Sequence, residues 1–394
     1  MALSYGLTNP AAFKKGGGSE PTPIGYKMYQ SNGTFACQES NDFGLTWTDC
    51  TYDKFGNYNK YGLVYDPVND KVVVINSYSP YNSSVGWYSY YATPVLNTTT
   101  QFTAGTLRTK SPQSSSSKNK YDVYGSVFDY GTNSIIGVRE DTYYDPYDYD
   151  YFINSDYLSP NTFTSLSLPN RHGAAFNIVT GKNGINLEIQ KVIDTGFQAN
   201  VFRFVKNSST SYTKDIIASI STNTLNISDR SSVSAAYLKD VGFVVCHYPN
   251  SQVSSQNYVF TQLIGFDGTV SGKKRWDNST RGTFAVSSNN YYSDRVYFAF
   301  GTAVYYTTDG INWNTCSGTL PSNVATSGII LNADNNVAIS LGGYGPWTNG
   351  YWAISTDGGN NFVKSAPIKM NPLRPESCTQ NSAGVSTILV PFYS

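Results

Sequence analysis

The stretch that decides the fold is the repeat unit Ser327 to Ala366, and near its end stand the eight residues Ser355-Thr356-Asp357-Gly358-Gly359-Asn360-Asn361-Phe362. Three apolar runs precede that segment, at Gly328 to Leu331, Val337 to Leu341 and Tyr351 to Ser355. Short apolar runs bounded by Gly, Asn and Asp are typical of β-strands joined by tight turns. The unit therefore predicts four consecutive strands, A to D, with the Asp- and Gly-rich segment as the turn between C and D.

The same order of runs and turns recurs along the chain. Thr283 to Ser317 repeats it and contains Thr307-Thr308-Asp309-Gly310-Ile311-Asn312-Trp313 at the equivalent turn. Earlier units start near Gly62, Gly125, Gly173 and Ser232. A period of about 40 to 60 residues indicates the stacked blades of a β-propeller. The absence of a convincing amphipathic helical pattern also favours an all-β chain.

A seventh unit is divided between the two ends of the chain. After the start at Gly384 only one strand remains, Val385 to Pro391. Its missing partners are expected near the N-terminus, at Tyr26 to Gln30, Thr34 to Glu39 and the hairpin Ser40 to Cys50. We therefore predict an all-β, seven-bladed β-propeller of four-stranded antiparallel blades, closed by pairing of the N-terminal strands with the C-terminal strand. Closure removes the unpaired sheet edges that would otherwise template aggregation.

Three of the C to D turns share a motif. Ser40-Asn41-Asp42-Phe43-Gly44-Leu45-Thr46-Trp47 matches every position of S-x-D-x-G-x-T-W, the Asp-box or BNR repeat. Ser355 to Phe362 matches with Phe in place of Trp, and Thr307 to Trp313 matches with one residue fewer. The chain thus resembles the sialidase-like Asp-box propellers, by motif in three blades and by periodicity in the rest.

The chemistry of this box is structural. The Asp carboxylate can accept hydrogen bonds within its own turn, Gly supplies a positive φ, and the aromatic residue packs between neighbouring sheets. The turn also lies on the face opposite the usual ligand face, so we predict no catalytic role for it. The box residues are Ser40, Asp42, Gly44, Trp47, Thr307, Asp309, Gly310, Trp313, Ser355, Asp357, Gly359 and Phe362.

Composition and charge bound the partners. Lys plus Arg and Asp plus Glu both number 27, so no net field attracts nucleic acid or an anionic bilayer. No apolar run approaches the roughly 18 residues of a membrane span, and the N-terminus lacks a secretory signal, so we expect synthesis in the cytoplasm. Cys37 and Cys50 should be cross-strand neighbours, and free thiols are favoured over a bridge.

Two parts of the chain are expected, residues 1–23 as an N-terminal arm and residues 24–394 as the propeller. The arm carries Lys14, Lys15, three glycines and two prolines without an alternating pattern. Such a segment is either a disordered tail or an anchor to other proteins of a virion.

Function is expected on the face formed by the B to C connections. Three of them are long, namely Ser77 to Val85, Glu140 to Asp150 and Gly343 to Gly350. The middle one alternates acid with Tyr, a combination suited to sugar rings or a protein interface. The candidate ligand-binding residues are Trp87, Tyr88, Tyr143, Tyr144, Asp145, Tyr147, Asp148, Tyr149, Tyr344 and Trp347.

Two alternatives for the middle connection stay open. One is a Ca²⁺ site made by Asp145, Asp148 and Asp150, although the regular glycine-bearing spacing of known Ca²⁺ loops is absent. The other is a solvated variable loop with no ligand. No other cofactor is expected.

Catalysis is disfavoured but left open. The chain has only five Glu, so the sialidase set of three Arg, a Tyr–Glu pair and an Asp acid cannot be transferred to it. Glu140 and Asp141 are the tempting acid pair of a glycosidase, but adjacent strand residues point apart. His172 and His247 are the only histidines, which argues against a His-based triad or a zinc site, and both are expected to be structural.

Three functions follow. The favoured one is a non-enzymatic adhesion propeller of a bacteriophage or other virion, a tail, fibre or capsid-decorating protein that binds a host-surface glycan or receptor. A glycoside hydrolase or lyase of Asp-box type is the second, and a cellular assembly scaffold is the third.

Overall fold

The computed structural model describes the strands, several of the turns between them and one short helix. Its described residues are 25–31, 34–40, 48–50, 58–68, 71–78, 88–94, 102–103, 121–141, 148–154, 163–167, 172–192, 196–209, 211–225, 233–248, 258–277, 284–289, 292–321, 325–333, 336–342, 349–364, 368–369, 378–380 and 386–389. Side chains are described for a subset of these, chiefly between residues 177 and 321 and between 337 and 364. The predicted arm, residues 1–23, lies outside the described residues.

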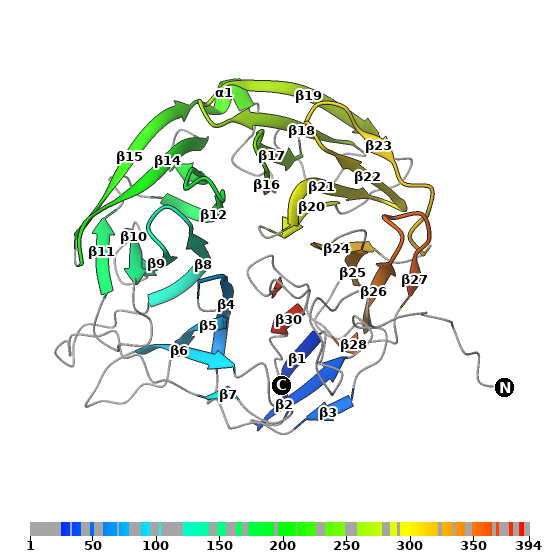
Figure 1. Ribbon diagram of the computed structural model, residues 1–394, viewed down its shortest axis with the longest axis horizontal. Helices are drawn as coiled ribbons and strands as arrows, with labels where there is room; N and C mark the ends of the chain where they lie inside the picture. Colours follow the sequence, from blue (N-terminus) through cyan, green and yellow to red (C-terminus); the bar gives the residue numbers. More distant parts are fainter. Residues whose placement is uncertain are drawn as a thin grey trace.

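The described strands form seven sheets arranged around a centre (Figure 1). Two sheets come from the first part of the chain: β4 (Tyr58–Asp66), β5 (Lys71–Tyr78), β6 (Tyr88–Pro94) and β7 (Phe102–Thr103), then β8 (Tyr121–Asp129), β9 (Ser134–Asp141), β10 (Asp148–Asn154) and β11 (Phe163–Ser167). The third contains β12 (His172–Thr180), β13 (Asn186–Val192), β14 (Gly196–Ser208) and β15 (Ser211–Ile220), and helix α1 (Thr222–Leu225) follows it.

Three further sheets follow the same order. They are β16 (Val233–Leu238), β17 (Gly242–His247), β18 (Tyr258–Gly265) and β19 (Val270–Asp277); β20 (Phe284–Asn289), β21 (Tyr292–Phe300), β22 (Ala303–Thr307) and β23 (Asn314–Thr315); and β24 (Ala325–Ala333), β25 (Asn336–Gly342), β26 (Asn349–Ser355) and β27 (Val363–Lys364). The two-residue strand β28 (Ile368–Lys369) also pairs with β26. In each, consecutive strands pair antiparallel, with the first strand nearest the centre and the last at the rim (Figure 1).

The seventh sheet joins the two ends of the chain. It has the order β29 (Cys378–Gln380), β30 (Ser386–Leu389), β1 (Gly25–Ser31), β2 (Thr34–Ser40) and β3 (Thr48–Cys50). Pairing of N-terminal with C-terminal strands is as predicted, with Gly25 opposite Ser386 and Met28 opposite Leu389. The prediction that this sheet has four antiparallel strands is wrong, because β1 and β30 are parallel and β29 is a fifth strand. Because β29 and β30 form a hairpin at the edge of this sheet, β30 runs in the direction opposite to the one predicted and lies parallel to β1.

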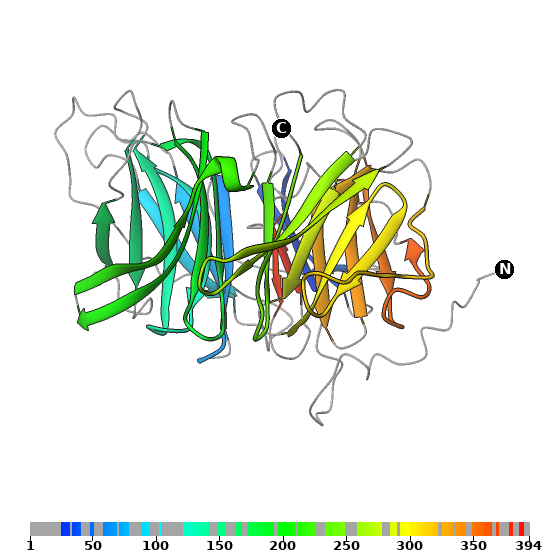
Figure 2. The ribbon, with the colours of Figure 1, turned by 90° about the horizontal axis from the view of Figure 1, so that it is seen from above.

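Apolar clusters fill the space between neighbouring sheets. Along β17, Val245 belongs to the cluster shared with the β12–β15 sheet, whereas Val244 and Cys246 belong to the cluster shared with the β20–β23 sheet. Alternate side chains of one strand therefore enter two different cores. Figure 2 shows the sheets standing side by side, with strands running between the two faces of the ring.

The cysteines agree with the predicted register. Cys37 in β2 lies directly opposite Cys50 in β3, which confirms that they are cross-strand neighbours. Among the residues with described side chains, Cys246 and Cys316 are buried free thiols.

Candidate functional site

The three long connections join equivalent strands. They link β5 to β6, β9 to β10 and β25 to β26, the second and third strands of their sheets. Because the first strand is innermost in each sheet and neighbours are antiparallel, the strand ends that these connections join lie at one face of the ring of sheets. Residues 79–87, 142–147 and 343–348 themselves lie outside the described residues. So do the candidates Trp87, Tyr143, Tyr144, Asp145, Tyr147, Tyr344 and Trp347.

The remaining candidates lie at strand ends on that face. Tyr88 begins β6 opposite Tyr78, and Asp148 and Tyr149 begin β10. Of the proposed Ca²⁺ ligands, Asp148 and Asp150 lie in β10 and Asp145 is outside the described residues. Where the chain is described, no group of three His, Cys, Asp or Glu residues could bind a metal ion.

The backbone register concentrates acid at this end of the β8–β11 sheet. Asp141 of β9 lies opposite Asp148 of β10, and Glu140 lies opposite Asp122 of β8. Like charges directly opposite each other destabilise a sheet. Tyr149 lies opposite Glu140 in the same group. A breach of local pairing rules of this kind is expected at functional sites, where binding outweighs stability.

The first described box turn uses its acid within the turn. The Asp309 carboxylate accepts hydrogen bonds from the backbone N–H of Ile311 (2.9 Å) and Asn312 (2.7 Å) and from the Asn312 side chain (2.7 Å). Burial alone raises the pKa of Asp309, but these hydrogen bonds outweigh it and lower the pKa to about 2. Gly310 has φ 74°, a region that L side chains avoid.

The second described box turn repeats this arrangement. Asp357 accepts hydrogen bonds from Ser355 Oγ (2.7 Å) and from the backbone N–H of Asn360 (3.0 Å) and Asn361 (2.9 Å). Gly359 has φ 95°, and an added Cβ there would lie 2.5 Å from Cys316 Sγ of the preceding sheet. Both carboxylates are therefore engaged by their own turns, which is a structural role.

The box turns also connect neighbouring sheets. Ser317 Oγ, just after β23, donates to Asn360 Oδ1 (2.8 Å), and Gly318 N–H donates to Gly359 O (3.0 Å). Trp313 packs edge-on against Trp276 of the β16–β19 sheet. In the N-terminal box Ser40 ends β2, and Asp42, Gly44 and Trp47 lie outside the described residues.

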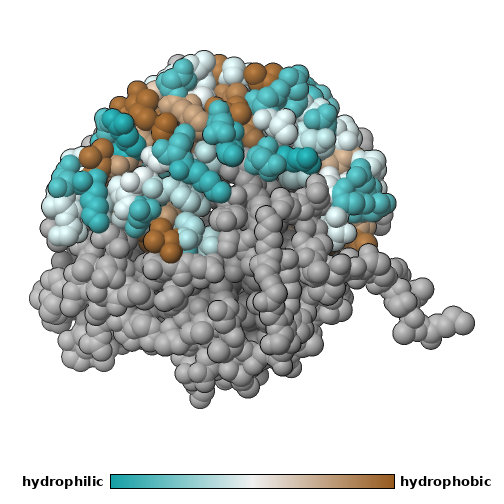
Figure 3. All heavy atoms as spheres, viewed as in Figure 1, coloured by the Kyte–Doolittle hydropathy of each residue, from teal (hydrophilic) through white to brown (hydrophobic). Residues whose placement is uncertain are grey.

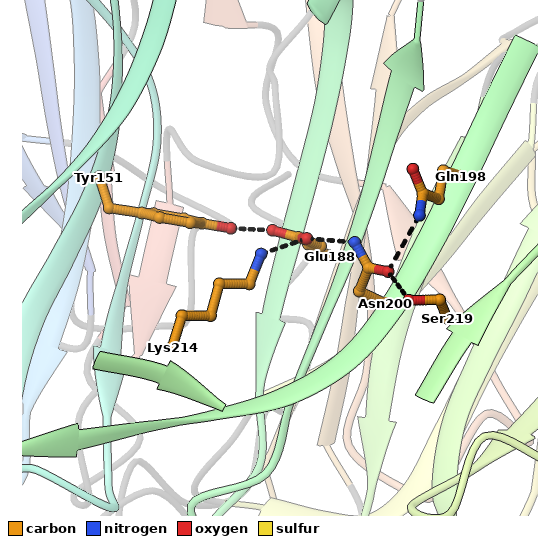
Figure 4. A network of polar contacts seen from close by, with 6 residues as sticks. All are labelled: Tyr151, Glu188, Gln198, Asn200, Lys214 and Ser219. Atoms are coloured by element: carbon orange, nitrogen blue, oxygen red, sulfur yellow. Dashed lines mark hydrogen bonds and ion pairs between the residues drawn. The ribbon is translucent and has the colours of Figure 1, made fainter. Parts of the chain in front are cut away.

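A buried polar network links the β8–β11 and β12–β15 sheets (Figure 4). Glu188 accepts hydrogen bonds from Tyr151 Oη, Lys214 Nζ and, at 2.5 Å, Asn200 Nδ2. Ser219 Oγ donates to Asn200 Oδ1 (2.8 Å). Burial raises the pKa of Tyr151 well above 10, and the charge of Glu188 adds to that rise. Burial lowers the pKa of Lys214, while Glu188 acts in the opposite direction.

This network was not predicted from the sequence. Tyr151 and Glu188 are fully buried, so a substrate cannot reach their reactive oxygens and the pair is not a nucleophile. The strand Asn186–Val192 alternates polar with apolar residues, a pattern typical of a half-exposed strand. The structure covers both faces, so Asn186, Glu188 and Gln190 are as buried as Leu187 and Ile189.

Other buried polar groups in this part of the molecule are structural. Asp129 accepts from Asn186 Nδ2 (2.9 Å) across the same two sheets, and burial raises the pKa of its carboxyl. His247 lies fully buried, with Nδ1 2.9 Å from Tyr248 O and Nε2 2.6 Å from Gln262 Nε2. Burial lowers the pKa of His247 to about 4, so the ring is neutral, in line with the predicted structural role. His172 lies in β12, where its side chain is not described.

Comparison with known proteins identifies the fold alone. No family model matches the chain, and no curated protein matches it. The structure is similar to the S511A mutant of puromycin hydrolase complexed with PGG, with a TM-score of 0.53, 8% identity and 95% of this chain covered. The chain spans 58% of the length of that protein.

Two lectins match less well. The fungal Aleuria aurantia lectin, a six-bladed propeller, gives a TM-score of 0.40 at 11% identity, covering 88% of this chain and 96% of the lectin. SapL1 lectin in complex with α-methyl fucoside gives 0.39 at 13% identity, covering 76% and 97%. The described sheets arranged around a common centre define the chain as an all-β propeller, and the similarity to the puromycin hydrolase structure concerns the fold alone.

The surface gives one further observation. On the face seen in Figure 3, hydrophobic side chains of the coloured residues are scattered among hydrophilic ones. In the part of the chain that is described, no helix is long and apolar enough to cross a membrane.

Proposed function

We propose that this protein is a non-enzymatic binding propeller of seven blades, closed by the β1–β30 pair, whose β9–β10 face binds a glycan or receptor. The observation that carries the proposal is the acidic register at the end of the β8–β11 sheet. Placing Asp141 opposite Asp148 and Glu140 opposite Asp122 is expected to cost stability, because like charges directly opposite each other weaken a sheet. Binding of a ligand with many hydroxyl donors would offset this loss of stability, because carboxylates are strong hydrogen-bond acceptors.

Tyrosine supplies the other half of the chemistry. Tyr149 lies opposite Glu140, and the segment before it is Tyr143-Tyr144-Asp145-Pro146-Tyr147. Tyrosine rings offer a rigid apolar face with a hydroxyl at the tip, which suits stacking on sugar rings. Acid and aromatic groups together favour a neutral glycan over an anionic ligand.

The proposed setting is a virion or other particle surface. Residues 1–23 would anchor the propeller to other virion proteins, and the face bearing the long connections would point to the host cell. The composition supports this setting, with 33 Tyr and equal numbers of basic and acidic residues.

A glycoside hydrolase or lyase is the second candidate. Two residues directly opposite each other on paired strands lie on the same face of the sheet, whereas the successive residues Glu140 and Asp141 of one strand lie on opposite faces. The pairs Asp122 with Glu140 and Asp141 with Asp148 therefore supply an acid pair of the kind that glycosidases require.

A glycan array, followed by a hydrolysis assay on every bound glycan, separates the two candidates. Binding without turnover supports the adhesion proposal, and turnover would overturn it in favour of the hydrolase. Replacing Tyr144, Tyr147 and Tyr149 by Ala should abolish binding with little change in melting temperature.

A charge variant sharpens the test. Asp148→Asn removes one like-charge pair, so it should raise stability by about 0.2–1 kcal/mol while weakening glycan binding. Asp277→Asn is the matched control, since Asp277 is an exposed acid at the end of β19 that pairs with Arg275 at 2.7 Å. It should leave binding unchanged. An Asp148→Asn variant that is no more stable, or that binds as well as the parent, contradicts the proposal.

A further inference from the structure

The β14–β15 ribbon extends beyond its own sheet. Strand β13 pairs with β14 only as far as Phe202, whereas β14 and β15 remain paired to Ser208 and Ser211. Residues 203–208 therefore pair with β15 alone among the described strands. Figures 1 and 2 show this ribbon projecting past its sheet, with its tip beside β11 of the preceding sheet.

The ribbon packs on the β8–β11 sheet. Phe204 and Tyr212 enter the same apolar cluster as Ile136, Tyr151 and Ile153 of that sheet. The Phe204 ring meets the Tyr151 ring edge-on, with centroids 5.3 Å apart. Tyr212 Oη lies 3.2 Å from Ser134 Oγ at the start of β9. Burial of these apolar side chains thus holds the ribbon against the β8–β11 sheet.

Hydrogen bonds of the polar network add a second connection between the same two sheets. Tyr151 Oη donates to Glu188, and Lys214 of the ribbon donates to the same carboxylate (Figure 4). The Lys214 ammonium also lies over the Tyr151 ring at 5.2 Å and the Phe202 ring at 4.5 Å. A buried carboxylate with donors from both sheets fixes their relative position, because each lost hydrogen bond leaves a buried polar group unpaired.

The tethered strand is the one that begins with the acidic register. Tyr151 follows Asp148 by three residues in β10, about 10 Å along a strand. Asp141 of β9 is paired directly opposite Asp148 of β10, a like-charge pair that is expected to weaken the pairing at that end. The hydrogen bond from Tyr151 to Glu188 is a tether that holds β10 against the β12–β15 sheet close to that end.

We propose that Tyr151, Glu188 and Lys214 are positioning residues that hold the Asp148–Asp150 end of β10 in place for ligand binding. This inference rests on the proposed function for its biological meaning. The tether itself can be measured without any ligand.

Hydrogen exchange tests the tether. Tyr151→Phe and Glu188→Gln should speed amide exchange in β10 and at the Asp141 end of β9, relative to the parent chain. Tyr297→Phe is the matched control, because Tyr297 is also buried, at 2% exposure, between the β20–β23 and β24–β27 sheets. It should leave exchange in β10 unchanged. Unaltered β10 exchange in Tyr151→Phe would overturn the inference.

Binding to a glycan array provides the functional readout. Tyr151→Phe should weaken binding to the strongest glycan of the parent chain by about fivefold, the equivalent of one hydrogen bond. Lys214→Met should do the same, and Lys214→Arg should restore binding, since a merely apolar role for the side chain would favour Met.

The two proposals fail differently. A parent chain that binds no glycan contradicts the proposed function, while the exchange data still decide whether the tether exists. A parent chain that binds, with Tyr151→Phe unchanged in both binding and exchange, overturns the positioning role alone.

Discussion

Two of the interfaces between adjacent sheets are built from different chemistry. Between the β16–β19 and β20–β23 sheets the contact is almost wholly apolar, with Phe298 packed against Trp276 (centroids 5.0 Å apart) and Trp313 (5.8 Å). Between the β8–β11 and β12–β15 sheets, apolar residues surround the buried Glu188, with Tyr151 and Lys214 as its partners.

This difference in chemistry affects how precisely each interface fixes the relative position of its two sheets. Apolar contacts stabilise in proportion to the area buried and tolerate small shifts. A buried charged network is weak evidence for stability, because desolvation offsets its attraction, but it accepts few geometries. The polar interface is the one that adjoins the proposed binding end of β10.

The largest effect is expected in the apolar interface. Phe298→Ala removes a fully buried ring and should destabilise the fold by about 3–5 kcal/mol. Chemical denaturation measures this, with Ile216→Ala as the control, since Ile216 is 43% exposed and should cost little. Equal losses in the two variants would contradict the expectation that apolar burial between these sheets stabilises the fold.

Low pH is expected to destabilise the protein at a third interface, where α1 meets the β16–β19 sheet. There His247 contacts Gln262, and Gln262 Nε2 donates to Leu225 O of α1 at 2.7 Å. The pKa of His247 is about 4 when folded and 6.5 when unfolded, so the unfolded chain binds more protons between these values. Stability should therefore fall as pH drops from about 6.5 to about 4, by about 3 kcal/mol in total. His247→Gln should lose this dependence; a pH profile identical to that of the parent chain would contradict it.

A smaller loss is expected in the polar interface. Glu188→Gln should cost about 1–3 kcal/mol, because Lys214 then keeps its charge without a buried counter-ion. A double-mutant cycle with Lys214→Met measures the coupling, which should be about 0.5–3 kcal/mol. Additive losses would show that the two side chains act independently.

The smallest loss is expected in the box turns. Asp309→Ala removes the acceptor for two backbone N–H groups and should cost about 1 kcal/mol, as the loss of a helix N-cap does. Thermal melting checks this, with Asp267→Ala in the β18–β19 turn as a comparison outside the boxes. A change in glycan binding by Asp309→Ala without a change in melting temperature would contradict the structural role.

The sequence alone determined the strand order of the propeller. Apolar runs and Gly-, Asn- and Asp-rich turns depend on local backbone preferences, so the units from Ser327 and Thr283 could be recognised without tertiary contacts. The register of Cys37 with Cys50 followed from the length of one hairpin. The direction of β30 could not be predicted, since the short β29 that reverses the chain has no distinct pattern.

Only the tertiary structure decided which polar residues are buried. Glu188 lies in a strand whose alternation is typical of a sheet with one wet face, yet a second sheet covers that face. Likewise, Asp141 and Asp148 face each other only because β9 and β10 pair in one particular register. Local sequence encodes the period of a strand, whereas the neighbour of each face is set by packing between segments far apart in the chain.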